Sequence, residues 1–118
     1  MASYEHLKDR TKKFAITVIR AVQGMSRNWI FEILGKQLVR AATSVGANYR
    51  SACRARSRAD FISKISIVEE ESDEAQYWLE ILEALGALPP QKVGPHFQEA
   101  KELTAIFTAS RRTAKQRR

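Results

Sequence analysis

The sequence contains little cysteine, glycine and proline. Its single cysteine, Cys53, excludes an internal disulfide, and no group of thiols is present that could hold zinc or an iron–sulfur centre. Five glycines and three prolines in 118 residues are too few for a largely disordered chain. We therefore expect a folded protein of a reducing compartment, which indicates a cytoplasmic location.

Long apolar runs and strand patterns are also missing. No stretch of about 18 apolar residues occurs, so no helix is expected to span a membrane. The first residues lack the basic start and apolar run of a signal peptide. Alternating β-branched residues between turn signals appear nowhere, which excludes strands. Only helices remain, and neither secretion nor membrane insertion is expected.

Residues suited to a buried helix face recur at alternate steps of four and three, and we call each such row a seam. The three seams are Leu7, Thr11, Phe14, Val18, Ala21 and Met25, then Leu34, Leu38, Ala41, Val45, Asn48 and Ala52, and then Phe61, Ile65, Val68, Ser72, Ala75, Leu79 and Leu82. This spacing predicts helices over residues 9–25 and 29–54. A third helix is predicted to begin after Ser57 and to end at Gly86, and a fourth is predicted to begin with Pro95. The short connections predict an all-α, antiparallel up-down-up-down four-helix bundle. We expect one domain, residues 1–118, with a basic tail from about residue 111.

Small and apolar residues outside the narrow seams suggest further contacts. Asn48 falls on the predicted apolar face of the second helix, where a lone asparagine can set register. Ala42 and Gly46 form a small-x-x-x-small pair suited to close approach of another helix, while Ile19 and Val22 widen the apolar face of the first helix. These four small and apolar residues are the predicted contacts in a homo-oligomer.

The net charge of +7 and the pI near 9.9 become informative once the topology is considered. In an up-down bundle, the start of helix one, the turn between helices two and three, and the end of helix four share one end. We call this end the basic pole, and it holds thirteen of the twenty lysines and arginines. They are Lys8, Arg10, Lys12, Lys13, Arg50, Arg54, Arg56, Arg58, Arg111, Arg112, Lys115, Arg117 and Arg118. Only Glu5, Asp9 and Asp60 are expected nearby to offset them.

Clustered cations of this kind favour phosphate binding, so RNA or DNA is the predicted partner. Tyr49, among the arginines, is a candidate for stacking on a base. A simpler interpretation is that these cations complement helix dipoles and keep the tail solvated. The predicted nucleic-acid contacts are Arg50, Arg54, Arg56, Arg58, Arg111, Arg112 and Lys115.

The acidic run at residues 69–74 has a structural explanation. Counting equal distances from the predicted turn near Arg56 places Arg40 opposite this run, so Arg40 is expected to pair with Glu69 or its neighbours. A di-metal carboxylate site would need Glu-x-x-His motifs on facing helices, and the sequence has none. We expect no metal.

No catalytic constellation is recognisable. Cys53 has no histidine near it in sequence, and His6 and His96 lie outside the strong heptads. The glycines are isolated and form no phosphate-binding loop. We expect neither enzymatic activity nor a cofactor, and no small-molecule substrate is evident.

Two stretches carry a family resemblance, at residues 37–50 and 61–80. Residues 42–48 read Ala-Thr-Ser-Val-Gly-Ala-Asn, and a shorter likeness extends over residues 106–111. The sequence resembles bacterial four-helix-bundle proteins related to those encoded in intervening sequences of the 23S ribosomal RNA.

The resemblance implies a four-helix bundle assembled as a homopentameric ring, without established enzymatic activity. A relative with the same architecture is the accessory protein of diversity-generating retroelements, which works with nucleic acid. The chain departs from many members at residues 49–54, Tyr-Arg-Ser-Ala-Cys-Arg, where an Ile-Ala-Glu-Gly pattern is common. This removes an acid and adds arginines. The function we expect is nucleic-acid association through the basic pole, and the alternative is a protein–protein interaction scaffold with no nucleic-acid partner.

Overall fold

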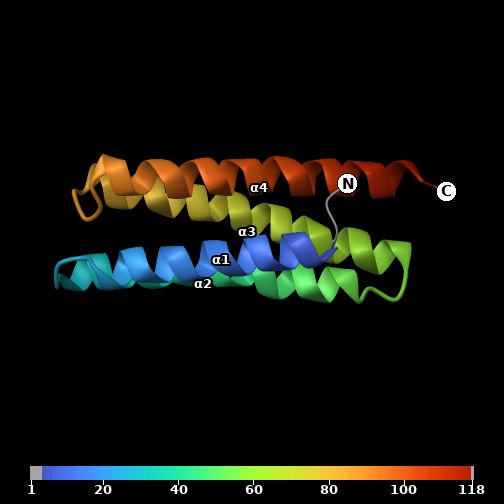
Figure 1. Ribbon diagram of the computed structural model, residues 1–118, viewed down its shortest axis with the longest axis horizontal. Coiled ribbons are helices and arrows are strands. Elements are labelled where there is room, and N and C mark those ends of the chain that lie inside the picture. Colours follow the sequence, from blue (N-terminus) through green and yellow to red (C-terminus); the bar gives the residue numbers. More distant parts are fainter. Residues whose placement is uncertain (1–3, 118) are drawn as a thin grey trace.

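Four long helices form an antiparallel bundle in the computed structural model, which describes residues 4–117 (Figure 1). They are α1 (Tyr4–Gln23), α2 (Trp29–Cys53), α3 (Arg58–Ala84) and α4 (Pro90–Gln116). Each helix packs against the next one in sequence, and α1 also packs against α4, in the least extensive of the four helix–helix contacts. The molecule measures 50 × 23 × 21 Å. The predicted up-down-up-down bundle is confirmed. No described helix is long and apolar enough to cross a membrane.

Side-chain caps start the two central helices. The Asn28 side-chain oxygen accepts hydrogen bonds from the backbone N–H groups of Ile30 and Phe31, at 2.9 and 3.2 Å. The Ser57 hydroxyl oxygen accepts the N–H of Asp60 at 3.0 Å. Each cap satisfies donors that the first helical turn leaves unpaired. These two helices begin where the sequence predicted.

The predicted bounds of α1 were less accurate, because the helix begins at Tyr4 rather than at residue 9 and ends at Gln23 rather than at residue 25. The predicted end of α2 differs by one residue. Gly86 ends α3 with a φ of 75°, which is costly for residues with a Cβ. The prolines after Gly86 prevent α3 from continuing, as expected.

The prediction that α4 begins at Pro95 was wrong. Pro90 is its first residue, and Pro95 lies inside the helix. A proline ring clashes with the Cβ of the preceding residue when that residue is helical, but Gly94 has no Cβ. The Gly94-Pro95 pair is thereby accommodated within the helix.

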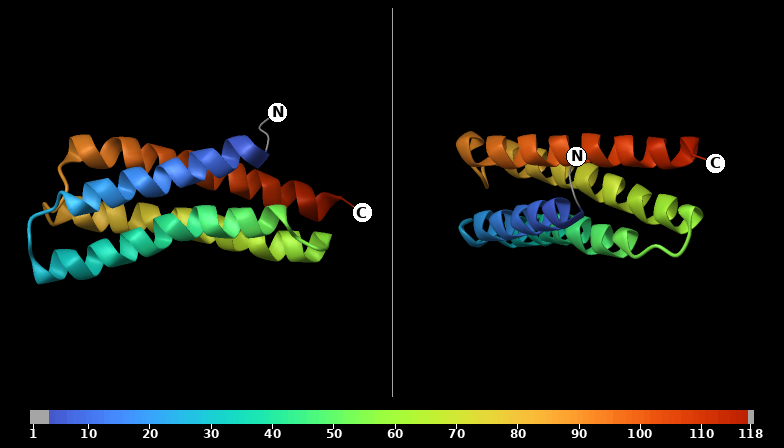
Figure 2. Two further views of the ribbon diagram at one scale, coloured as in Figure 1. Left: turned by 60° about the horizontal axis from the view of Figure 1, so that its bottom comes forward. Right: turned by 45° about the vertical axis from the view of Figure 1, so that its right-hand side comes forward.

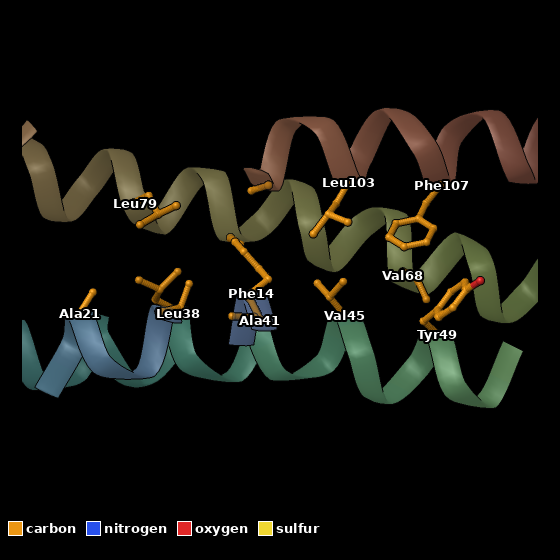
Figure 3. Close-up of a cluster of buried hydrophobic side chains, with 14 of the residues drawn as sticks. Phe14, Ala21, Leu38, Ala41, Val45, Tyr49, Val68, Leu79, Leu103 and Phe107 are labelled. Atoms are coloured by element: carbon orange, nitrogen blue, oxygen red, sulfur yellow. The ribbon is translucent and has the colours of Figure 1, made fainter. Parts of the chain in front are cut away.

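The four helices lie side by side along the bundle (Figure 2). One apolar core draws on all four of them, and Figure 3 shows part of it. The predicted seams of α1 and α3 are confirmed except at Met25 and Phe61, which are only partly buried. Their buried residues are Leu7, Thr11, Phe14, Val18 and Ala21 in α1, and Ile65, Val68, Ser72, Ala75, Leu79 and Leu82 in α3.

The predicted seam of α2 was wrong at one position. After Val45 the buried side chain is Tyr49, 3% exposed, and Asn48 is only partly buried. The Asn48 side-chain amide donates to the carbonyl of Ser44 at 2.9 Å within its own helix. The step after Val45 is four rather than three, so Asn48 does not set register in the core.

The small residues of α2 serve the contact with α1 in the same chain. A Cβ added to Gly46 would lie 3.2 Å from the Thr11 hydroxyl oxygen, and one added to Gly35 would lie 2.9 Å from Val22 Cγ1. Ala42 is completely buried. Ala42 is therefore enclosed within one bundle and has no surface left for a second copy. Gly46 and Val22 contact the neighbouring helix but remain partly exposed, so their predicted contact with a second copy stays a prediction.

Candidate nucleic-acid interface

The four helices bring the basic pole together as predicted. The start of α1, the turn between α2 and α3, and the end of α4 lie toward the same end, the right-hand end of Figure 1. Helix α4 extends beyond the start of α1 at this end. Arg118 belongs to the predicted set but lies outside the described residues.

The turn between α2 and α3 carries the clearest group of free cations. Arg50, Arg54, Arg56 and Arg58 are all exposed. None of the four takes part in an ion pair within residues 4–117. Their charges are available to an external anion.

The one carboxylate of this turn is engaged locally. Asp60 accepts the backbone N–H of Arg56 at 3.2 Å and pairs with Lys64 at 3.0 Å. Lys64, followed by the Arg56 backbone, lowers the pKa of the Asp60 carboxyl. Asp60 therefore fixes the shape of the turn, and its charge is offset by Lys64 and more weakly by Arg56. The side chains of the four arginines make no ion pair with it.

The end of α4 contributes both free and paired cations. Arg112, Lys115 and Arg117 are exposed and make no ion pair with any described residue. Arg111 instead holds Glu69 of α3, with Nε 2.6 Å and Nη2 3.3 Å from the carboxylate oxygens. Arg111 lowers the pKa of Glu69, and Glu69 raises the pKa of Arg111. Arg111, a predicted nucleic-acid contact, is thus engaged in an ion pair between α4 and α3.

The start of α1 likewise contains both unpaired and paired cations. Lys12 and Lys13 are exposed without an ion pair to any residue the structure describes, whereas Lys8 lies 3.3 Å from Glu5. Arg10 reaches across to α4, where it contacts Glu99 at 2.7 Å and Glu102 at 2.9 Å. Hydrogen bonding to Glu99 raises the pKa of Arg10. These two ion pairs were not predicted from the sequence, although Glu99 and Glu102 have the i, i+3 spacing of neighbours on one helix face.

The expectation that Glu5, Asp9 and Asp60 alone offset the basic pole was therefore incomplete. Three further acids, one on α3 and two on α4, neutralise Arg111 and Arg10. The cations of the basic pole that make no ion pair with any described residue are Lys12, Lys13, Arg50, Arg54, Arg56, Arg58, Arg112, Lys115 and Arg117.

Arg40 lies outside the basic pole and links α2 to α3. It pairs with Glu71 at 2.7 Å and also with Glu74. The prediction that Arg40 meets the acidic run is confirmed, but its partners are the neighbours of Glu69 rather than Glu69 itself.

The proposed base-stacking role of Tyr49 was wrong. Its ring is buried and packs against Phe107 of α4, with 5.3 Å between ring centroids (Figure 3). Burial, followed by contact with Cys53, raises the pKa of its hydroxyl. Tyr49 is a core residue beneath the basic pole.

Grooves along the sides of the bundle carry both signs of charge. The groove between α1 and α2, about 570 Å³, combines Lys12 and Arg50 with Glu5 and Asp9. The groove between α3 and α4 combines Lys101 and Arg112 with Asp73. Over residues 4–117, no three His, Cys, Asp or Glu side chains are placed to hold a metal ion.

His96 faces the groove between α1 and α4, together with Lys13, Glu99 and His6. Burial, with a smaller effect of Lys92, lowers the pKa of His96 below 6.5.

The lowered pKa of His96 makes stability depend on pH. The unfolded chain binds more protons than the native one as the pH falls through 6.5, so the free energy of unfolding decreases. We predict that His96→Gln weakens this decrease, which urea unfolding at neutral and mildly acidic pH will measure. An unchanged pH dependence would contradict the assignment.

Comparisons with known proteins agree on one family. A family model described as 23S rRNA-intervening sequence protein matches residues 6–109. The fold is similar to a crystal structure of a protein of unknown function from the S23 ribosomal protein family of Bacteroides thetaiotaomicron. That match has 30% identity and a TM-score of 0.82, and it covers 88% of this chain and 96% of the other. No curated protein matches the sequence.

Proposed function

The chain belongs to the 23S rRNA-intervening sequence protein family, and from this premise we propose that it is a non-enzymatic, oligomeric protein that binds RNA or DNA through the basic pole. The observation that carries the proposal is the turn between α2 and α3, where four arginines are exposed without an acidic partner in the described chain. Phosphates would supply that partner. Each phosphate neutralised releases condensed counterions, which drives binding at low salt.

The free cations come from three separate parts of the chain. Lys12 and Lys13 lie in the first half of α1, Arg54 and Arg56 lie in the turn between α2 and α3, and Arg117 follows α4. Only the folded bundle gathers them, so the binding surface depends on the fold. Phosphate contacts set position on a nucleic acid but carry no sequence information, so we expect little sequence preference.

A fluorescence anisotropy titration with a labelled RNA hairpin tests the proposal. We expect a dissociation constant of about 1 μM or lower at roughly 0.05 M salt, since sequence-independent binding reaches about 10⁻⁴–10⁻⁶ M at physiological salt and tightens as salt falls. The protein purified at low salt should also carry nucleic acid, visible in its absorbance ratio. Failure to bind at low salt would contradict the proposal.

Self-association belongs to the same proposal, with a ring of identical chains as the family resemblance implies. Large exposed apolar side chains support it at the end opposite the basic pole. There Trp29 is 70% exposed, Ile33 50% and Leu85 51%. A contact at this end buries apolar surface and leaves the basic pole free. Ile19, Val22 and Gly46, which were also predicted to contact a second copy, are partly buried.

We predict that Trp29→Gln combined with Ile33→Gln dissociates the oligomer. Light scattering at micromolar concentration should give a multiple of 13.4 kDa for the unmodified chain and about this value for the double variant. Ile67→Gln is the matched control, because Ile67 is 40% exposed but lies in the half of α3 nearer the basic pole. A monomeric unmodified chain would overturn the ring.

A protein-interaction scaffold without nucleic acid is the second candidate, and the same exposed apolar side chains favour it. In that case the apolar end would hold a different protein and the cations would serve only solubility. Purified protein free of nucleic acid, with stable co-elution of another protein that the Trp29 and Ile33 substitutions abolish, would favour this candidate.

A further inference from the structure

We infer that the nucleic acid is double-helical and is held by its backbone phosphates on the blunt end of the bundle, rather than a single strand held by its bases. The inference rests on the proposed function of the basic pole and specifies its substrate class. Duplex RNA and duplex DNA share the phosphate chemistry on which it depends.

The first observation concerns aromatic side chains. Proteins that hold single strands stack successive bases on exposed aromatic rings. At the basic pole Tyr49 is buried, Phe107 is completely buried, and Phe61 is partly buried against the core. Tyr4, 60% exposed, is the one exposed Phe, Tyr or Trp at this end of the described chain. One ring does not make a platform for successive bases.

The second observation concerns the grooves. Single strands run along positively charged grooves, but the grooves between α1 and α2, α1 and α4, and α3 and α4 all contain carboxylates beside the cations of the basic pole. Glu5 and Asp9 line the groove between α1 and α2, and Asp73 lines the groove between α3 and α4. Of the unpaired arginines at the turn, Arg50 lines the groove between α1 and α2. Arg54, Arg56 and Arg58 lie at the end of the bundle instead, where Asp60 is offset by Lys64. The surface suited to phosphates is therefore an end, not a channel.

Charge density then favours the duplex. Double-helical DNA carries one negative charge per about 1.7 Å, twice the charge density of one strand. Each phosphate contact releases about 0.9 of a counterion from a duplex and about 0.7 from a single strand. With about six contacts, the logarithm of affinity should change by about 5.4 per decade of salt for a duplex and about 4.2 for a strand. Each tenfold reduction of salt thus favours the duplex by a further factor of about 16.

The test compares four labelled probes by anisotropy over a range of salt concentrations. They are an RNA duplex and a DNA duplex of roughly 20 base pairs, about two helical turns, and an oligouridine and an oligothymidine of matching length. We expect both duplexes to bind about tenfold more tightly than the single strands at low salt, with the steeper salt dependence. A tighter complex with one duplex would identify RNA or DNA as the preferred source of phosphates.

The variant Tyr4→Ala separates phosphate binding from base stacking. We expect the affinity for the duplexes to change by less than about twofold, since a single stacked base would account for about 1–3 kcal/mol, a fivefold loss or more. Single strands that bind as tightly as duplexes, or a large loss in Tyr4→Ala, would overturn this inference while leaving the basic pole as the binding surface. Absence of binding to all four probes would instead overturn the proposed function.

Discussion

Replacing Arg50, Arg54, Arg56 and Arg58 together by glutamine is expected to weaken binding of an RNA duplex on the order of a thousandfold at about 0.1 M salt. All four side chains are exposed and make no ion pair with the described residues, so their loss removes up to four phosphate contacts. Each contact contributes about 0.9 to the slope of the logarithm of affinity against the logarithm of salt. The magnitude of this slope should therefore be smaller by about 3.6 for the variant than for the unmodified chain.

A matched variant separates position from net charge. Arg20, Arg27, Lys36 and Lys92 are also exposed and make no ion pair with the part of the chain that the structure describes, but they lie in the half of the bundle away from the basic pole. Replacing them by glutamine removes the same four charges. We expect the affinity to fall by less than about tenfold, through the long-range potential alone. Equal losses in the two variants would show that total charge, rather than the basic pole, determines binding.

The second large effect concerns stability. Phe107→Ala is expected to lower the free energy of unfolding by about 3–5 kcal/mol, measured by urea denaturation. Phe107 of α4 is completely buried and packs against Tyr49 of α2 (Figure 3). Its ring thus joins two helices that are not neighbours in sequence. Because whole domains are stable by only about 5–15 kcal/mol, this loss is a large fraction of the total.

Phe97→Ala provides the comparison on the same helix. Phe97 packs against the core but is only partly buried. The free energy lost on truncation scales with buried apolar area and with the cavity left behind. The Phe97 variant should therefore lose roughly half as much stability, or less. Similar losses in both variants would contradict the view that Phe107 anchors α4 in the core.

Much of the fold followed from the sequence, because helix periodicity and capping are local signals. The six buried residues of α3 were all predicted from spacing, and Ser57 and Gly86 bound the helix as capping chemistry requires. The start of α4 was mispredicted because proline is common at the first position of a helix, and the prediction places Pro95 at that position. The sequence pattern did not show that Gly94 would let the helix continue through it.

The candidate site was predictable in outline but not in detail. Topology alone brings the cations of three segments to one end. The ion pairs of Arg10 with Glu99, and of Arg111 with Glu69, depend on helix rotation, which spacing does not determine. Rotation also decides whether Tyr49 faces solvent or core, since one residue moves a side chain by about 100° around the helix. For the same reason Asn48 was misplaced.

The central claim is that phosphates bind where the unpaired cations converge. Backbone amide NMR signals of the full chain, recorded with and without an RNA duplex, test it without any substitution. The account predicts shifts concentrated at residues 50–58 and 112–117, with little change at the opposite turns, residues 24–28 and 85–89. Shifts confined to those opposite turns, or absent throughout at low salt, would contradict it.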